Sequence, residues 1–197
     1  MKKIIFLSAI IFCSFYPAVK ELQIGSPIPN VNVKMKDVSD KEISFNDARK
    51  KNGLLVMFSC NTCPVVMRNQ DRTKEICKLA QEKGIGVILI NSNEGSRDEG
   101  DSFDDMKSYA SEQGYDWFYT LDKNSIMADA FGAMRTPENF LFDKNLKLVY
   151  HGAIDDNPGN PADVVHKYLA EAINQMIGGK EVTIKTSRSI GCGIKRL

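Results

Sequence analysis

Apolar residues along the chain fall into short continuous runs and into stripes with helical spacing. Residues 54–58 are wholly apolar and residues 85–90 nearly so, a pattern typical of strands buried on both faces of a sheet. Two further runs, 138–142 and 146–150, flank a short polar turn and predict two consecutive strands. Residues 117–121 form one more extended segment.

Four other segments have the pattern of helices. Residues 64–83 carry an apolar stripe, and residues 102–113 open on a sequence that resembles a capping box. Residues 125–131 predict a short helix. Asn160-Pro161 resembles a helix cap followed by a first-turn proline, so we expect a last helix from there to Met176.

The predicted order is strand, helix, strand, helix, strand, helix, two strands, helix. Strands that alternate with helices indicate a partly parallel sheet with helices on both faces. The two consecutive strands add an antiparallel hairpin at one end. The sequence therefore predicts an α/β fold with a central mixed sheet. Residues 20–47 precede it as an N-terminal extension, in which a short strand or hairpin is expected near Ile43 and Phe45.

The first 18 residues resemble a secretory signal. Lys2 and Lys3 precede a nearly continuous apolar run at residues 4–15, which is too short for a membrane span of about 20 residues. Cleavage after Ala18 would leave a periplasmic or otherwise extracytoplasmic protein. An uncleaved segment would tether the domain to a membrane, and a lipid on Cys13 is a further alternative.

The length, composition and net charge limit the number of domains and the classes of binding partner. The 197 residues suit one domain at residues 19–180, followed by a C-terminal tail at 181–197. The 26 basic and 25 acidic residues give a net charge of +1, which offers no electrostatic case for nucleic acid. The acidic stretch 94–105 lacks the spacing of a calcium loop and is interpreted as a solvated loop. No metal or other cofactor is expected.

The candidate chemistry lies in Cys60-Asn61-Thr62-Cys63, which follows a buried strand and opens a helix. Unpaired N–H groups and the helix dipole favour a thiolate at Cys60, lowering its pKa from about 8.5 toward about 7 or below. Cys60 would attack a disulfide and Cys63 would resolve the mixed disulfide. A structural disulfide and half of a metal site remain alternatives, although no second cysteine pair completes a zinc site. Cys77 lies on the apolar stripe and is expected to be an inert core residue.

Four segments together resemble the thioredoxin-like redoxins, in the alkyl hydroperoxide reductase/thiol-specific antioxidant-like branch. They are residues 58–64 with the cysteine pair, 135–143, 148–152 and the tail segment 191–196. The resemblance implies a thioredoxin-like fold and a thiol-disulfide oxidoreductase that acts on protein thiols and disulfides with a thiol electron donor. It also implies that Pro137 is a cis proline facing the cysteine pair, and that backbone groups of Thr136 pair with an extended substrate.

The chain departs from its relatives in ways that keep two other functions open. The strand before Cys60 has no acidic residue for proton relay, and the threonine three residues before a peroxidatic cysteine is replaced by Met57. Arg135 nevertheless falls where a thiolate-stabilising arginine of a peroxidase would lie, although a solvated or salt-bridged surface position is the alternative. A thiol peroxidase that uses Cys60 on peroxide is therefore one alternative function. A non-enzymatic metal carrier or binding protein of the same fold is the other.

Cys192 lies between two glycines near the C-terminus, in a segment expected to be mobile. We hypothesise that it forms a disulfide with Cys60 or Cys63, as a second relay or a regulatory lock. A free thiol or an intermolecular bridge are the alternatives.

Overall fold

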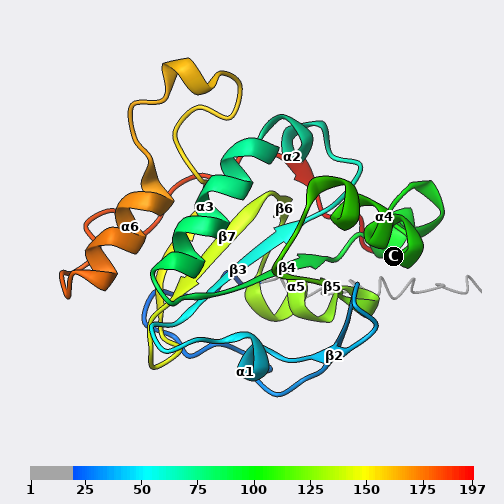
Figure 1. Ribbon diagram of the computed structural model, residues 1–197, viewed down its shortest axis with the longest axis horizontal. Coiled ribbons are helices and arrows are strands. Elements are labelled where there is room, and N and C mark those ends of the chain that lie inside the picture. The colour runs from blue at the N-terminus through cyan, green and yellow to red at the C-terminus, as the bar shows by residue number, and fades with distance from the viewer. Residues whose placement is uncertain (1–19) are drawn as a thin grey trace, which may run out of the picture.

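A seven-stranded mixed sheet forms the centre of the computed structural model, which describes residues 20–197 (Figure 1). The expected signal segment and Cys13 lie outside the described residues. The strand order is β2-β1-β5-β4-β3-β7-β8, with β3, β4 and β5 parallel to one another. The strands are β1 Met35–Asp37, β2 Glu42–Ile43, β3 Leu54–Ser59, β4 Gly86–Asn91, β5 Phe118–Leu121, β7 Glu138–Phe142 and β8 Leu148–Gly152.

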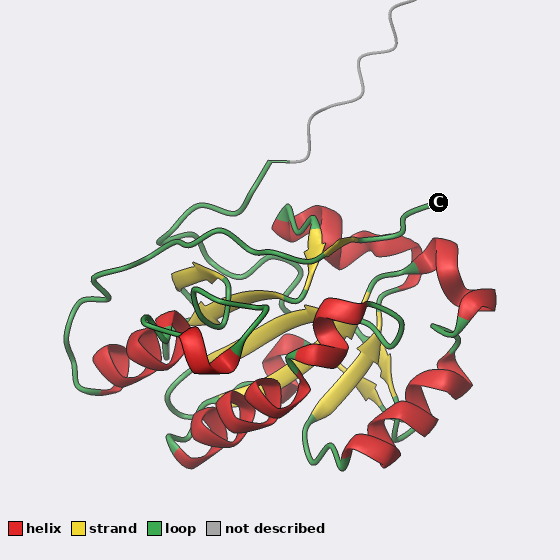
Figure 2. Ribbon diagram, turned by 90° about the horizontal axis from the view of Figure 1, so that it is seen from above, coloured by secondary structure: helices red, strands yellow, loops and turns green. Residues whose placement is uncertain are grey.

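Helices cover both faces of this sheet, as predicted (Figure 2). They are α1 Phe45–Ala48, α2 Pro64–Arg68, α3 Gln70–Glu82, α4 Phe103–Gln113, α5 Ile126–Phe131 and α6 Tyr168–Ile177. Alternate residues of β3 serve two apolar clusters: Phe58 packs with α1 and α5, whereas Met57 packs with α3, α4 and α6. This double burial explains why the strand sequence is continuously apolar.

Antiparallel strands lie at both edges of the sheet. The expected hairpin of β7 and β8 is present at one edge. At the other edge, β1 and β2 form a hairpin that pairs with β5, so the strand expected near Ile43 is confirmed. The prediction is wrong at Phe45, which begins α1 because the Ser44 side chain caps that helix. Among residues 20–197, no helix is long and apolar enough to cross a membrane.

The helix expected at residues 64–83 is divided into α2 and α3 at Asn69. The Asn69 side chain donates to the Val65 carbonyl oxygen at 2.7 Å, and its backbone angles leave the helical region. Such competition between an asparagine side chain and the helical hydrogen bonds is a common cause of a break. The break makes α2 a separate short helix, and its N-terminus follows directly on Cys63.

The last helix begins at Tyr168, so the prediction that it starts at Pro161 is wrong. Asn160 does cap Pro161, but only for the short 3-10 turn η3 Pro161–Asp163. The Asp156 carboxylate then accepts hydrogen bonds from the backbone N–H groups of Val165 and His166. These contacts hold the chain in an extended loop, which delays the helix by about two turns.

After α6 the chain returns across the molecule as a long tail. It first runs beside β8, where His151 exchanges backbone hydrogen bonds with Lys185 and Ser187. It then forms β9 Cys192–Gly193, which pairs antiparallel with β6 Arg135–Thr136 in a separate two-stranded sheet. In Figure 1 this last strand, in red, lies near α2. The tail thus ends beside the cysteine pair.

Candidate active site

The two cysteines lie where β3 gives way to α2. Cys63 is the residue that precedes the first turn of α2, and Pro64 occupies the first helical position, where its missing N–H leaves no bond unmade. Both cysteines are reduced and almost completely buried, with 1% of Cys60 and 2% of Cys63 exposed. Solvent alone therefore does not reach the candidate redox atoms.

Thr136 lies directly against both sulfur atoms. Its Oγ1 is 3.3 Å from the Cys60 sulfur, and its carbonyl oxygen lies 3.3 Å from the Cys63 sulfur, from which it accepts a hydrogen bond when that thiol is protonated. The peptide bond between Thr136 and Pro137 is cis, as the family resemblance implies. The structure therefore brings together the four residues Cys60, Cys63, Thr136 and Pro137.

Asp101 holds the two residues between the cysteines, a role that the sequence analysis did not predict. Its carboxylate is fully buried and accepts hydrogen bonds from the Asn61 backbone N–H at 2.8 Å and the Thr62 hydroxyl at 2.9 Å. The amides of Asn91 and Asn93 donate to the same carboxylate. The solvated-loop interpretation of the acidic stretch is therefore wrong at Asp101.

The pKa values of Cys60 and Cys63 depend on each other, because one proton can be shared between their sulfur atoms. A hydrogen bond from the Cys60 thiol, supported by the backbone N–H groups of Val66 and Cys192 and by the Cys192 thiol, lowers the pKa of Cys63. The same sulfur–sulfur bond, together with burial and the negative charge of Asp101, raises the pKa of Cys60. With the tail in place, hydrogen bonding thus favours the thiolate on Cys63, whereas the sequence predicts it on Cys60.

The two accessory candidates both belong to the tail contact. Cys192 is half-buried and joins Cys60 and Cys63 in one small cluster with Val65 and Val66. Arg135 is exposed, and its guanidinium donates to the Gly191 carbonyl oxygen at 3.1 Å. Within residues 20–197 no hydrogen bond joins Arg135 to either sulfur of the pair.

This chain matches the Redoxin family over residues 23–168. It belongs to the redoxin family. A thiol-disulfide oxidoreductase named ResA from Geobacillus thermodenitrificans (strain NG80-2) is 22% identical over 138 residues, which cover 70% of this chain and 74% of the relative. An uncharacterized conserved protein from Geobacillus kaustophilus superposes with a TM-score of 0.82 at 31% identity, covering 89% of this chain and 93% of that one.

A hypothetical protein from Sinorhizobium meliloti 1021 gives a TM-score of 0.79 at 29% identity, covering 90% of this chain and 97% of that chain. These likenesses confirm the thioredoxin-like α/β fold predicted from the sequence. Both superpositions extend over most of the described redoxin chain rather than over the central sheet alone.

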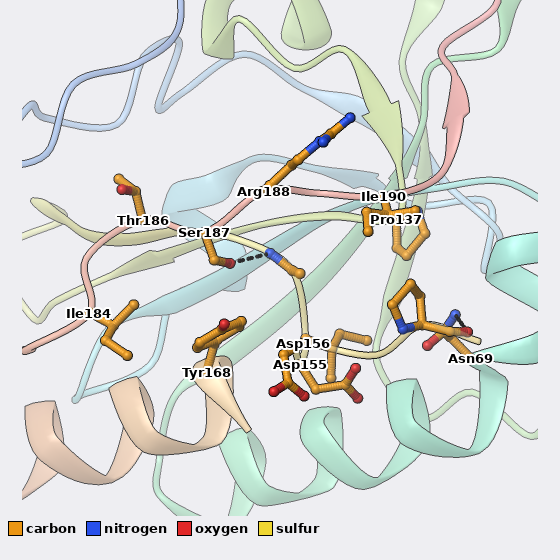
Figure 3. Close-up of a pocket in the computed structure, with 13 residues that line it drawn as sticks. Asn69, Pro137, Asp155, Asp156, Tyr168, Ile184, Thr186, Ser187, Arg188 and Ile190 are labelled. Carbon is orange, nitrogen blue, oxygen red and sulfur yellow. Dashed lines mark hydrogen bonds between the residues drawn. The ribbon is translucent and has the colours of Figure 1, made fainter. Parts of the chain in front are cut away.

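A cavity of about 320 Å³ opens beside the cis proline of this redoxin (Figure 3). Pro137 and Ile190 lie at one end of it, and Tyr168 and Asp155 line the opposite wall. The tail residues on either side of Ser187 form one wall, and the Ser187 hydroxyl accepts a hydrogen bond from the Ala153 backbone N–H at 3.0 Å. The cavity thus depends on the tail for its shape.

A second buried carboxylate, Glu138, supports the strand that carries Thr136. Its Oε2 accepts hydrogen bonds from the backbone N–H groups of Met134 at 2.7 Å and Arg135 at 3.0 Å. Its Oε1 lies 2.8 Å from Nε2 of the buried His151. A charged residue at the start of a fully buried strand is the sequence feature that could have indicated this role.

The remaining described thiol, Cys77, is fully buried in the cluster under α3, and burial raises its pKa. Its placement agrees with the inert core role predicted for it. Among residues 20–197 there is no group of three or more cysteine, histidine or acidic side chains positioned to bind a metal ion.

Proposed function

We propose that this redoxin is a thiol-disulfide oxidoreductase that exchanges disulfides through Cys60 and Cys63. The single observation that carries the proposal is the meeting of two buried, reduced thiols with Thr136 at the cis peptide bond. The relative ResA is named a thiol-disulfide oxidoreductase, which agrees with this proposal. The substrates proposed are protein disulfides, and a separate thiol donor returns the pair to the reduced state.

In the proposed reaction the Cys60 thiolate attacks a substrate disulfide and releases one substrate sulfur as a thiolate. The Cys63 thiolate then attacks Cys60 in the mixed disulfide, forms the Cys60–Cys63 disulfide and releases the second substrate sulfur. Two electrons pass from the pair to the substrate, and each released thiolate takes up a proton.

A substrate must displace the tail before this attack, because the tail lies against the buried pair. Its departure removes the Cys192 thiol and N–H from Cys63, which are two of the donors that favour a thiolate there. The Thr136 hydroxyl and the Cys63 backbone N–H remain to favour a thiolate on Cys60. These two groups, together with the position of Cys60 ahead of the N-terminus of α2, are the reasons for keeping Cys60 as the attacking sulfur in this proposal.

The proposal also places the enzyme outside the cytoplasm. The support is the basic and apolar start of the sequence, Lys2-Lys3 followed by residues 4–15. A compartment in which disulfides persist would supply the substrates.

The test combines turnover and trapping with the full chain. Wild-type protein and Cys77→Ala, the control for a buried thiol outside the site, should reduce insulin disulfides in the presence of dithiothreitol. Cys60→Ser and Cys63→Ser should fall to the rate of dithiothreitol alone. In cells, Cys63→Ser should accumulate mixed disulfides through Cys60, and the N-terminal sequence of the recovered protein should begin near residue 19.

Other outcomes would contradict specific parts of the proposal. Mixed disulfides that accumulate only with Cys60→Ser would reverse the roles of the two cysteines. Peroxide consumption that needs Cys60, without insulin turnover, would instead support a thiol peroxidase. Tight binding of zinc or copper(I) that needs Cys60, again without turnover, would support a carrier. An intact N-terminus in a cytoplasmic fraction would contradict export.

A further inference from the structure

The C-terminal tail occupies the place that the proposed mechanism assigns to a substrate. Cys192 stands opposite Thr136 in the antiparallel pair of β9 and β6, and Gly193 stands opposite Arg135. Thr136 is the residue whose backbone is expected to pair with an extended substrate strand. The tail therefore places Cys192 beside the redox pair and pairs with Thr136 as an extended substrate is expected to do.

Specific contacts hold the tail in this position. The Ile194 backbone N–H donates to the Met134 carbonyl oxygen at 3.0 Å, and the Ile194 side chain is buried in an apolar cluster. Farther along, the Lys195 N–H donates to Asn93 Oδ1 at 3.0 Å. Arg196 reaches the Ala133 carbonyl oxygen at 2.6 Å. The docking thus rests on anchors beyond the cysteine itself.

Close packing makes Gly191 necessary for this docking. A Cβ atom at position 191 would lie 2.0 Å from the Thr136 carbonyl oxygen, a backbone atom that cannot move aside cheaply. A Cβ atom at position 193 would meet nothing within 4 Å. Neighbouring glycines on either side of Cys192 therefore have opposite tolerance for a methyl group.

Cys192 packs against the small cluster that contains Cys60 and Cys63. Its strand pairing with Thr136, whose atoms lie 3.3 Å from both of those sulfurs, holds it beside the pair. Cys192 is also partly exposed, whereas Cys60 and Cys63 are almost wholly buried. In the docked state Cys192 is thus the most exposed of the three cysteines in the cluster.

We propose that Cys192 is a third redox residue that takes the disulfide from the Cys60–Cys63 pair and carries it to the surface. This inference rests on the proposed function, which first forms the Cys60–Cys63 disulfide. The Cys192 thiol loses its proton to solvent and attacks the Cys63 sulfur. A Cys63–Cys192 bond forms, the Cys60–Cys63 bond breaks, and Cys60 leaves as a thiolate that takes up a proton.

The exchange needs no further oxidant, because one disulfide replaces another and the electron count is unchanged. Cys63 is the sulfur attacked because Cys192 packs against the cluster that contains it, and Cys63 is the member of the pair whose charge acts on Cys192. The new disulfide then offers the partly exposed Cys192 sulfur to an external thiol donor. The donor can therefore reduce the enzyme without first displacing the tail.

Peptide mapping of the oxidised protein tests the transfer directly. The full chain is oxidised with one equivalent of diamide, quenched in acid, alkylated and digested with trypsin without reduction. Cleavage gives residues 52–68, with both Cys60 and Cys63, and residues 189–195, with Cys192. We expect a cross-link between these two peptides in which fragmentation places the alkyl group on Cys60. Alkylation of Cys192 alone, with every disulfide inside peptide 52–68, would overturn the proposal.

Two glycine variants separate docking from mere proximity of cysteines along the chain. Gly191→Ala should lower the yield of the cross-linked peptides by at least about tenfold, because the tail loses its high local concentration at Cys63. Gly193→Ala should retain the wild-type yield. Equal yields from both variants would contradict transfer to a docked tail.

Insulin reduction by Cys192→Ser distinguishes failure of this inference from failure of the proposed function. If Cys192→Ser turns over insulin disulfides and wild type forms no cross-link, the transfer is wrong while exchange through Cys60 and Cys63 stands. If neither protein reduces insulin or forms a disulfide inside peptide 52–68, the proposed function itself fails, and the inference fails with it.

Discussion

The carboxylate of Asp101 holds the loop between Cys60 and Cys63 through hydrogen bonds. It receives four hydrogen bonds, from Asn61, Thr62, Asn91 and Asn93, and so ties the cysteine loop to the segments that follow β4. Hydrogen bonds to a charged group each contribute about 1.5–3 kcal/mol. The same negative charge raises the pKa of Cys60, so Asp101 acts on both the order and the ionisation of the site.

Replacing this carboxylate with an amide should separate the two effects. Asp101→Asn replaces one carboxylate oxygen with an NH₂ group, which cannot accept the hydrogen bonds that the neighbouring donors offer. We therefore expect the free energy of unfolding to be about 2–3 kcal/mol lower and insulin reduction to be slower. The thiolate absorbance near 240 nm of a Cys63→Ser background should nevertheless shift to lower pH, because the charge that opposes the Cys60 thiolate is gone.

The control for this substitution is Asp98→Asn, which changes an exposed carboxylate in the same acidic stretch. It should leave both stability and the Cys60 titration unchanged. A titration that moves equally in the two variants would show that general charge, and not the contact of Asp101 with the site, sets the pKa of Cys60.

Residue chemistry explains which parts of the site the sequence could predict. Cys60 and Cys63 could be predicted from residue type and local spacing, whereas Pro137 was predicted from the resemblance of segment 135–143 to the redoxins. Asp101 was missed because its role depends on four donors brought together by the fold, while the neighbouring acidic residues are solvated. The proximity of Cys192 to Cys63 could be hypothesised from the flanking glycines, but its strand pairing with Thr136 depends on tertiary contacts.

At the scale of elements, β9 closes the edge that β6 would otherwise leave unpaired. An unpaired strand is a ready site for an added strand, so any extended substrate at Thr136 competes with the tail for the same backbone groups. The tail therefore carries Cys192, the proposed third redox residue, and it also blocks the entry of a substrate at Thr136.

Weakening the tail should speed the reaction with large disulfide substrates. Gly191→Ala removes the close approach to Thr136 and opens the groove, so we expect insulin reduction at least about threefold faster than wild type with excess dithiothreitol. Gly193→Ala is the matched control and should retain the wild-type rate. A Gly191→Ala rate at or below wild type would mean that the tail does not limit substrate access.

Elements also differed in how far their sequences could predict them. The buried strands β3 and β4 were predicted almost to their ends, because burial on both faces leaves a continuous apolar run. The break at Asn69 and the late start of α6 were not, since each results from side chains bonding to backbone groups: Asn69 to Val65, and Asp156 to Val165 and His166. The periodicity of apolar residues along the chain does not indicate these competing hydrogen bonds.

At the scale of the whole molecule, the shifted pKa values of the cysteine pair make the stability of the reduced protein depend on pH. In the unfolded chain both thiols have an ordinary pKa, between about 8.5 and about 9. In the folded, reduced protein the pKa of Cys63 is lowered and that of Cys60 is raised. Between the lowered pKa and pH 9 the folded state therefore binds one proton fewer than the unfolded state, and above pH 9 it binds one more.

The free energy of unfolding of the reduced protein should thus rise with pH up to about 9 and then fall, with a slope of at most about 1.4 kcal/mol per pH unit. Urea unfolding of wild type and Cys63→Ser, both kept reduced, measures this as a difference in which the other titrating groups largely cancel. The difference should grow between about pH 6 and about pH 8, because only wild type holds the stabilised Cys63 thiolate. Parallel curves for the two proteins would mean that the folded pair keeps both protons at neutral pH, and that the attacking thiolate forms only after a substrate has displaced the tail.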